Sequence, residues 1–198
     1  MHENSKLLFS KYAKPFFRSS SRILEIGPDA VPSSYRTIVG DETITWDTLD
    51  IFDSEKLTYP NVNEYHFPIP DNSYDVVVAG QVIEHVRKIW LWVCELERVC
   101  KKGGYVIIIN PVSWVYHEAP VDCWRIYPEG MRALCENTRL HIIISRFESL
   151  EAPGYKRYSP GISAAFQPKK LRLFYRIAGL VGVPVERAYD TITIAQKQ

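Results

Sequence analysis

Residues 67–86 constrain the fold of this chain more than any other segment. Turn-forming residues lead into a run of apolar or small residues, 76–80, and the run ends abruptly at Gln81. A continuous apolar run between polar boundaries is typical of a strand that is buried on both faces. Ligands of open α/β sheets bind just beyond the carboxyl end of such a strand. We therefore expect Gln81 and its neighbours Glu84 and His85 at a functional site.

The other segments alternate between strand and helix patterns. Strand patterns occupy residues 21–26, 43–49, 74–80, 105–109, 140–145 and 191–195, with a further short strand near 63–66. Helix patterns occupy residues 4–18, 87–102, 128–136 and 168–182, and a short helix is expected to open at Ser33 or Ser34. Alternation with wholly apolar central strands indicates a parallel sheet covered on both faces. We predict an α/β, doubly wound, Rossmann-like and mostly parallel sheet with an antiparallel last strand. It forms a single domain over residues 1–198, with its core at about 20–147.

The predicted helix over 87–102 has defined ends. Apolar residues recur along it at helical spacing, namely Ile89, Val93, Leu96 and Cys100. Lys101 and Lys102 are expected in its last turn, where cations complement the helix dipole. Gly103 and Gly104 are expected to end it.

Composition disfavours several classes of protein. The 198 residues carry a formal net charge of +1, so we expect no binding to nucleic acid or to an anionic membrane. No apolar run is long enough to span a bilayer. Lysines interrupt the apolar residues near the N-terminus and no cleavage site follows, so we expect a cytoplasmic protein. The four cysteines form no close CxxC pair, so we expect free thiols and no metal site.

Two further strand ends carry a glycine and carboxylates. Gly27 directly follows the first strand, where a glycine lets the backbone pass close to a ligand, and Glu25 and Asp29 flank it. Asp50 follows the second strand, where an acid can hold both ribose hydroxyls of a nucleoside. Each feature alone also fits a structural role, as a tight turn after a core strand or as a solvated acid.

Together these blocks resemble the class I S-adenosylmethionine-dependent methyltransferases, specifically the methyltransferase type 11 group, over residues 20–140 and more weakly at 190–197. The resemblance implies that the cofactor is S-adenosyl-L-methionine. It implies a cofactor-binding set after strands one, two and four: Glu25, Gly27, Pro28, Asp29, Asp50, Ile51, Asn63, Gly80 and Gln81.

One departure from the family pattern leaves a second class of function open. The family usually shows GxGxG after the first strand, whereas this chain keeps only Gly27 and has Asp29 and Val31 at the other two positions. A non-catalytic binding or scaffold protein with a degenerate cofactor loop is therefore the alternative. A nicotinamide-dependent oxidoreductase is disfavoured because the GxGxxG loop is absent.

Residues 111–127 are predicted to form a lid that contacts the substrate. A loop of this length in a compact domain is usually functional. Its pattern H-E-A-P-x-D-x-W-R, from His117 to Arg125, resembles methyltransferases associated with sugar, polysaccharide or natural-product assembly. The predicted substrate-binding residues are Trp114, Tyr116, Asp122, Trp124 and Arg125. A packed structural loop with an Asp122–Arg125 salt bridge is the alternative.

The expected reaction is O-methylation of a small hydroxylated acceptor. An oxygen acceptor benefits from a base near neutral pH, and His117 and His85 are the histidines in the right regions. Arg125 could hold an acidic or phosphate group, because its fork matches such anions. Apolar residues over 174–185 suggest a homodimer surface, and the tyrosine-rich basic segment 148–170 is expected to be a solvated loop.

Overall fold

The computed structural model of the chain describes residues 3–118, 120–151, 177, 181 and 188–198. The described strands form one six-stranded sheet in the order β2-β1-β3-β4-β6-β5. Their bounds are β1 Arg22–Ile26, β2 Thr45–Leu49, β3 Tyr74–Gly80, β4 Cys100–Pro111, β5 Leu140–Glu148 and β6 Asp190–Lys197.

The sheet is mostly parallel. β1 pairs in parallel with β2 and β3, and β3 pairs in parallel with β4. β6 lies between β4 and β5 and is antiparallel to both. The predicted α/β class and the antiparallel last strand are therefore confirmed.

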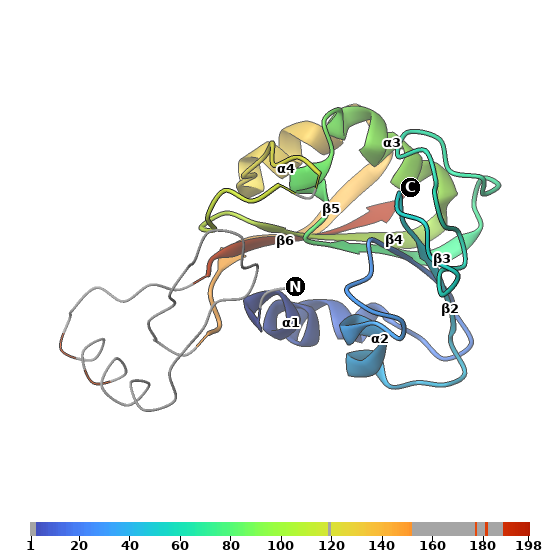
Figure 1. Ribbon diagram of the computed structural model, residues 1–198, viewed down its shortest axis with the longest axis horizontal. Helices are drawn as coiled ribbons and strands as arrows, with labels where there is room; N and C mark the ends of the chain where they lie inside the picture. Colours follow the sequence, from blue (N-terminus) through green and yellow to red (C-terminus); the bar gives the residue numbers. More distant parts are fainter. Residues whose placement is uncertain (1–2, 119, 152–176, 178–180, 182–187) are drawn as a thin grey trace.

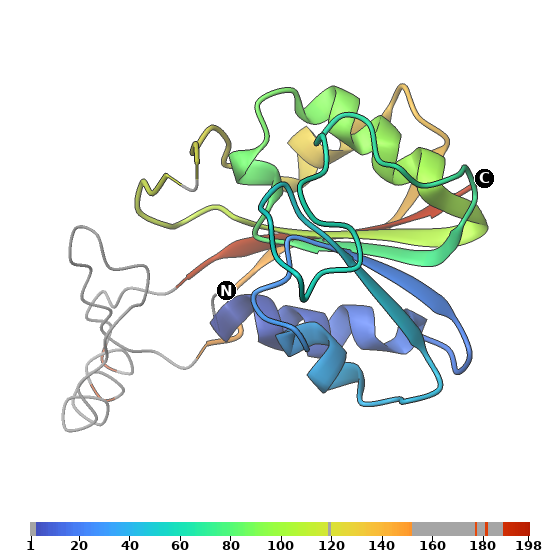
Figure 2. The ribbon, with the colours of Figure 1, turned by 45° about the vertical axis from the view of Figure 1, so that its right-hand side comes forward.

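Helices cover both faces of the sheet (Figure 1). α1 Glu3–Leu8 and α2 Ser34–Val39 lie on one face, and α3 Ile89–Val99 and α4 Pro128–Cys135 lie on the other. Figure 2 shows the same two layers from a second direction. The predicted N-terminal helix is present but continues beyond α1 as a π-helical segment, Phe9–Ala13, and a 3-10 turn, Lys14–Phe16. Within the described residues, no helix is long and apolar enough to cross a membrane.

The apolar run in β3 is explained by these two layers. Val76 and Val78 pack in the core with α1 and α2, whereas Val77 and Ala79 pack in the core with α3 and α4. A strand between two helical layers therefore has no face left for polar side chains. Burying each such valine stabilises the fold by roughly 1.5–3 kcal/mol.

The predicted end of the helix at 87–102 is wrong. α3 stops at Val99, and Lys101, Lys102 and the two glycines belong to β4. The reason is tertiary: Cys100 already pairs with Tyr74, and the Lys101 Nζ lies 2.8 Å from an Asp75 carboxylate oxygen. A Cβ on Gly104 would lie 2.7 Å from the Asp75 carbonyl oxygen, so this glycine allows two strands to approach closely.

Two other predictions have different outcomes. The expected strand at 63–66 is only an isolated bridge between Asn63 and His66. The helix at 168–182, the basic segment over 152–170 and the apolar segment 174–185 lie, apart from Ile177 and Val181, outside the described residues. The other predicted strands and the helices opening at Ser34 and Pro128 are confirmed within a few residues.

Candidate functional site

The carboxyl ends of β1, β2 and β3 surround a cavity of about 220 Å³. Each strand end contributes one of the predicted residues, Gly27, Asp50 and Gln81. Apolar side chains form most of the wall: Ile26, Leu49, Ile51, Phe52, Phe67, Val82, Val86 and Trp92. A second hollow of about 460 Å³ shares Ile51, Glu64 and His85 with this cavity. The edge of the sheet therefore has an apolar cavity and a second hollow beside it, which share these three residues.

Gly27 is the glycine that lines this cavity. Its φ is +62°, in the left-handed region that favours glycine. Its N–H donates to the Leu49 carbonyl at 2.9 Å, which ties the loop after β1 to β2. A Cβ at this position would lie 2.6 Å from the Val82 Cγ2 atom. The position therefore excludes a side chain on both conformational and steric grounds.

The backbone around Asp50 is held in place before any ligand binds. Its N–H donates to the Tyr59 carbonyl at 3.1 Å, and its carbonyl accepts from Val62 at 3.0 Å. Its carboxylate accepts from the Phe52 N–H at 3.2 Å. Asp50 and Ile51 thus enter the cavity from a loop with defined hydrogen bonds.

Gln81 is strained and incompletely hydrogen-bonded. Its φ is +61°, which is uncommon for a residue with a side chain and clusters at functional sites. Its N–H donates to the Ile109 carbonyl at 2.7 Å, and its Nε2 donates to Asp190 at 3.3 Å. Its buried Oε1 has no hydrogen-bond partner among the described residues. An amide oxygen in this state can accept a hydrogen bond from a ligand in the cavity.

The predicted cofactor residues Glu25 and Gly80 lie behind the cavity wall. One carboxylate oxygen of Glu25 accepts from the Ser33 hydroxyl and from the Trp46 indole. Burial raises the pKa of Glu25 to about 7, against the lowering effect of these two donors. A Cβ on Gly80 would lie 2.0 Å from the Tyr35 hydroxyl, so this glycine makes room for Tyr35. Neither residue lines the cavity, and their cofactor roles stay predictions.

The other predicted cofactor residues have different surroundings. The Asp29 carboxylate accepts from the Ser34 N–H and hydroxyl at 2.9 and 2.6 Å. Burial opposes ionisation of Asp29, but these bonds outweigh it and hold its pKa below the ordinary value. Asn63 lines the second hollow. Pro28 is not among the residues that line either space.

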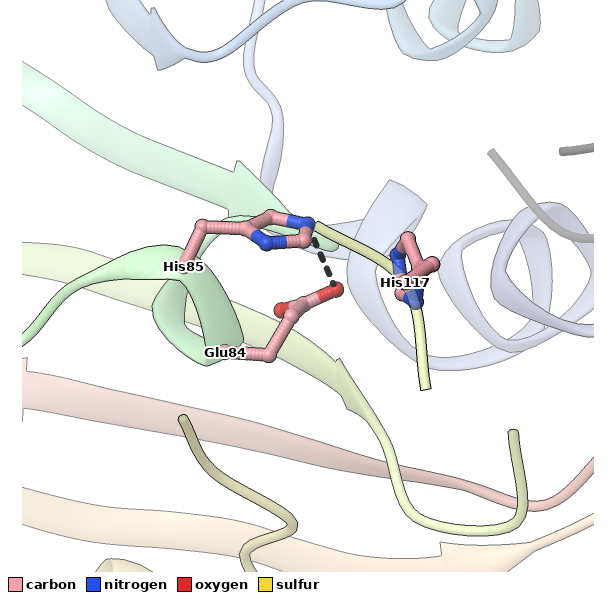
Figure 3. A group of neighbouring side chains, drawn as sticks. All are labelled: Glu84, His85 and His117. Carbon is pink, nitrogen blue, oxygen red and sulfur yellow. Dashed lines mark ion pairs between the residues drawn. The ribbon is translucent and has the colours of Figure 1, made fainter. Parts of the chain in front are cut away.

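Beside the cavity, Glu84, His85 and His117 form a cluster (Figure 3). Glu84 and His85 belong to a 3-10 turn, Ile83–His85, that follows β3, and His117 comes from the predicted lid. The Glu84 Oε1 lies 3.7 Å from the His85 Nε2, and the two imidazole rings are perpendicular with centroids 5.0 Å apart. Burial raises the pKa of Glu84 to about 8 and lowers the pKa of His85.

The loop that carries His117 is braced by an ion pair. The Arg125 guanidinium donates two hydrogen bonds to the Asp122 carboxylate, which also accepts from the His117 N–H at 2.8 Å. Burial opposes ionisation of Asp122, but the Arg125 and His117 donors hold its pKa below the ordinary value. The salt bridge that the alternative interpretation of this loop expected is present. Substrate roles for Asp122 and Arg125 stay predictions.

The aromatic residues of the loop differ in exposure. The Trp124 indole donates to the Val86 carbonyl at 2.8 Å and packs against the core. Tyr116 is 71% exposed and donates to Glu118. The Trp114 carbonyl accepts from Arg125 at 3.5 Å. Trp124 thus anchors the loop to the turn after β3, whereas Tyr116 faces outward.

Four further residues line the cavity without having been predicted from the sequence, namely Glu64, Val82, Phe67 and Trp92. The aromatic residues have ordinary core patterns, so nothing in the sequence separates them from other buried residues. Glu84 was noticed as a neighbour of His85 but was not given a role, because its burial cannot be seen from its position alone.

A family model described as a methyltransferase domain matches residues 46–108 of this chain. An uncharacterized methyltransferase of Schizosaccharomyces pombe is 45% identical over 42 residues. That match covers 21% of this chain and 15% of the length of the yeast protein.

Solved structures of methyltransferases are similar in fold to this chain over nearly its whole length. A SAM dependent methyltransferase from Archaeoglobus fulgidus has a TM-score of 0.61 and 17% identity, covering 97% of this chain and 92% of its own. A phosphoethanolamine N-methyltransferase of Haemonchus contortus, solved with phosphomonomethylethanolamine and S-adenosylhomocysteine, has a TM-score of 0.60 and 14% identity. It covers 98% of this chain and 52% of its own. At these identities the structural likeness concerns the fold.

Proposed function

We propose that this chain is a class I S-adenosylmethionine-dependent methyltransferase and that it transfers a methyl group to a hydroxyl oxygen of a small acceptor. The observation that carries the proposal is the cavity at three adjacent strand ends, lined by Gly27, Asp50 and Gln81. Such a crevice is the general ligand site of open α/β sheets.

The cavity fits S-adenosylmethionine on three grounds. Gly27 lines the cavity, and a Cβ at this position would push against Val82, which lines it too. The Gln81 Oε1, which has no hydrogen-bond partner in the described part of the chain, suits the ammonium group of the methionine part. Asp50 suits the ribose hydroxyls, and the neighbouring Ile51 and Phe52 offer apolar contact to the adenine.

When bound, S-adenosylmethionine supplies a methyl group on a positively charged sulfur, and transfer to an alcohol yields a methyl ether, S-adenosylhomocysteine and a proton. The chain therefore has two tasks. The apolar wall limits the access of water to the reacting groups. The hydrogen-bonded backbone around Gly27 and Asp50 orients the reactants, and orientation can lower much of the activation barrier. His85 and His117 are the groups available to ease loss of the acceptor proton.

The second hollow suits a hydroxylated acceptor such as a sugar, a polysaccharide precursor or a secondary metabolite. It is bordered by polar side chains, Asn63, Tyr65 and Arg87, as well as by His85. An acceptor in this hollow would meet the cofactor where the two spaces share His85. A cytoplasmic location and a homodimer stay predictions.

The test is calorimetric titration with S-adenosylhomocysteine, followed by incubation with methyl-labelled S-adenosylmethionine and a panel of sugars and phenolic or aliphatic alcohols. We expect one site of micromolar affinity and a labelled methyl ether. A protein that binds neither form of the cofactor would sink the proposal.

A non-catalytic role is the second candidate, favoured by the single glycine in the cofactor loop. The orientation of Asp29 weakens it, because the carboxylate is hydrogen-bonded to Ser34 rather than lining the cavity. Cofactor binding without methyl transfer to any acceptor would favour this candidate.

A further inference from the structure

We propose that Glu84, His85 and His117 bind one divalent first-row transition-metal cation, such as Zn²⁺, beside the cofactor cavity. Cation binding is independent of the methyl donor, whereas the role suggested for the cation rests on the proposed function. The cysteine spacing that argued against a metal site has no bearing on these three ligands.

Glu84 is the strongest indication of a missing partner. Its side chain is fully buried, and neither carboxylate oxygen has a hydrogen-bond partner among the described residues. The His85 Nε2 at 3.7 Å is too far for a hydrogen bond. Leaving a buried polar group unsatisfied costs roughly 1–3 kcal/mol, and more when the group is charged. A bound cation would satisfy both oxygens.

In both histidines Nδ1 is hydrogen-bonded to a backbone carbonyl, and Nε2 is the ring nitrogen that could bind a cation. The His85 Nδ1 lies 2.6 Å from the Val121 carbonyl oxygen, and the His117 Nδ1 lies 3.1 Å from the Val115 carbonyl oxygen. A carbonyl only accepts, so each Nδ1 carries the hydrogen and each Nε2 keeps its lone pair in the neutral ring. Metal-binding histidines almost always donate their second N–H in this way, which fixes the ring orientation.

The three side chains converge (Figure 3). One ligand atom from each lies within 4.8 Å of the others, and Figure 3 shows the Glu84 carboxylate turned toward the His85 ring. Ligands about 2.1 Å from a tetrahedral metal ion lie roughly 3.4 Å apart. Glu84 and His85 belong to the same short turn, so their separation changes little. The loop that carries His117 would therefore have to move toward them to bring the three ligand atoms to this spacing.

The ligand types indicate which cations fit. Imidazoles suit Zn²⁺, Fe²⁺, Co²⁺ and Ni²⁺, whereas Mg²⁺ and Ca²⁺ prefer sites made of oxygen. Three protein ligands also leave a position open, as in catalytic zinc sites. Because His85 borders both the cavity and the second hollow, an acceptor hydroxyl could occupy that position.

A cation in this position would activate the acceptor. Binding to the metal lowers the pKa of a hydroxyl, so the O–H bond breaks and the proton passes to solvent. The oxygen electron pair then forms the bond to the methyl carbon while the carbon–sulfur bond breaks, leaving the neutral thioether. In a metal-free protein the same imidazole nitrogens would be proton acceptors, so the two modes differ in their response to chelators.

The experiment is titration of EDTA-treated protein with Zn²⁺ by calorimetry, and with Co²⁺ by visible absorption. We expect one site in the wild type, with affinity at least 30-fold weaker in Glu84→Gln and in His117→Ala. His141→Ala is the matched control, because His141 is exposed on β5, and its affinity should stay within twofold of the wild type.

Two results would overturn the metal site. One is absence of binding by the wild type, and the other is equal binding by the wild type and both variants. An intense thiolate-to-cobalt absorption band would assign the ion to cysteine, because Cys94 and Cys123 are exposed.

Titration of every protein with S-adenosylhomocysteine separates this proposal from the previous one. Variants that bind the cofactor normally are folded, so loss of cation binding is then specific. Normal cofactor binding with no cation site would refute the metal proposal alone. A cation site in a protein that binds no cofactor would refute the methyltransferase activity alone.

Discussion

Two buried glutamates, one in β1 and one just after the neighbouring strand β3, differ in the hydrogen bonds that their carboxylates accept. Glu25, in β1, accepts hydrogen bonds from Ser33 and Trp46 at one carboxylate oxygen, and its other oxygen has no hydrogen-bond partner among the described residues. Glu84, just after β3, has no hydrogen-bond partner among the described residues. Burial raises the pKa of both, to about 7 and about 8.

This difference motivates the proposed role of Glu84 as a ligand for a cation. Glu25 links β1 to the start of α2 and to β2, so the scaffold itself supplies its donors. Glu84 belongs to the turn after β3, and within the described part of the chain the scaffold supplies no hydrogen-bond donor to its carboxylate. A bound ion is one explanation for a buried polar group that has no partner in the fold.

The largest expected effect is the difference in stability, about 3–5 kcal/mol, between the variants in which one or the other glutamate is replaced with methionine, which has a similar length and no strong acceptor. In metal-free protein at pH 6, Glu84→Met should raise the free energy of unfolding by about 1–2 kcal/mol, because it removes an unsatisfied group. Glu25→Met should lower it by about 2–3 kcal/mol, because Ser33 and Trp46 lose their acceptor. Urea denaturation measures both values, and changes of the same sign would break the comparison.

The second effect concerns pH. The pKa of Glu25 is raised to about 7 in the folded protein, so the folded state binds this proton more tightly than the unfolded state does. The stabilising contribution is complete below the unfolded pKa and is lost as pH rises toward 7. Between pH 4.5 and pH 8 the loss amounts to about 3 kcal/mol.

Glu25→Gln should remove that loss, so the unfolding free energy of the wild type relative to the variant should fall between pH 5 and pH 8. Urea denaturation across this range is the measurement. Glu42→Gln, at an exposed position, is the control and should run parallel to the wild type. A wild-type minus Glu25→Gln difference that does not change with pH would contradict the assignment.

The third effect tests the approach of β1 to the cavity. Gly27→Ala should weaken S-adenosylhomocysteine binding at least 30-fold, because its Cβ would meet Val82 at 2.6 Å. Gly103→Ala is the matched control: its φ of +75° gives similar backbone strain, of about 1 kcal/mol, but a Cβ there meets nothing within 4 Å. Calorimetry should show cofactor affinity within twofold of the wild type for the control. Equal losses in both variants would attribute the effect to strain alone.

The smallest effect concerns the charge at the end of β2. Asp50→Asn keeps the shape of the side chain but removes the charge that strengthens hydrogen bonds to ribose hydroxyls. We expect about fivefold weaker S-adenosylhomocysteine binding, which corresponds to about 1 kcal/mol. Asp53→Asn, three residues later and exposed, should bind as the wild type does. Unchanged affinity in Asp50→Asn would remove Asp50 from the site.

Much of the fold could be predicted because local patterns and tertiary environment agree. The run in β3 is wholly apolar since helices cover both of its faces, and the Ser33 cap begins α2 where its side chain accepts from the Arg36 N–H. The end of α3 could not be predicted, because pairing of Cys100 with Tyr74 extends β4 backward through residues with a helical pattern.

The amino-acid sequence by itself determined the class of fold and the three strand ends that meet at the cavity, because parallel strands bring their carboxyl ends to one edge of the sheet. Only the tertiary structure decided what each acidic side chain meets. It directs Asp29 to Ser34 and Glu25 to Trp46, and it brings His117 to Glu84 across 32 intervening residues. The burial of an acidic side chain and its hydrogen-bond partners depend on side chains from distant segments, so a local sequence pattern does not predict them.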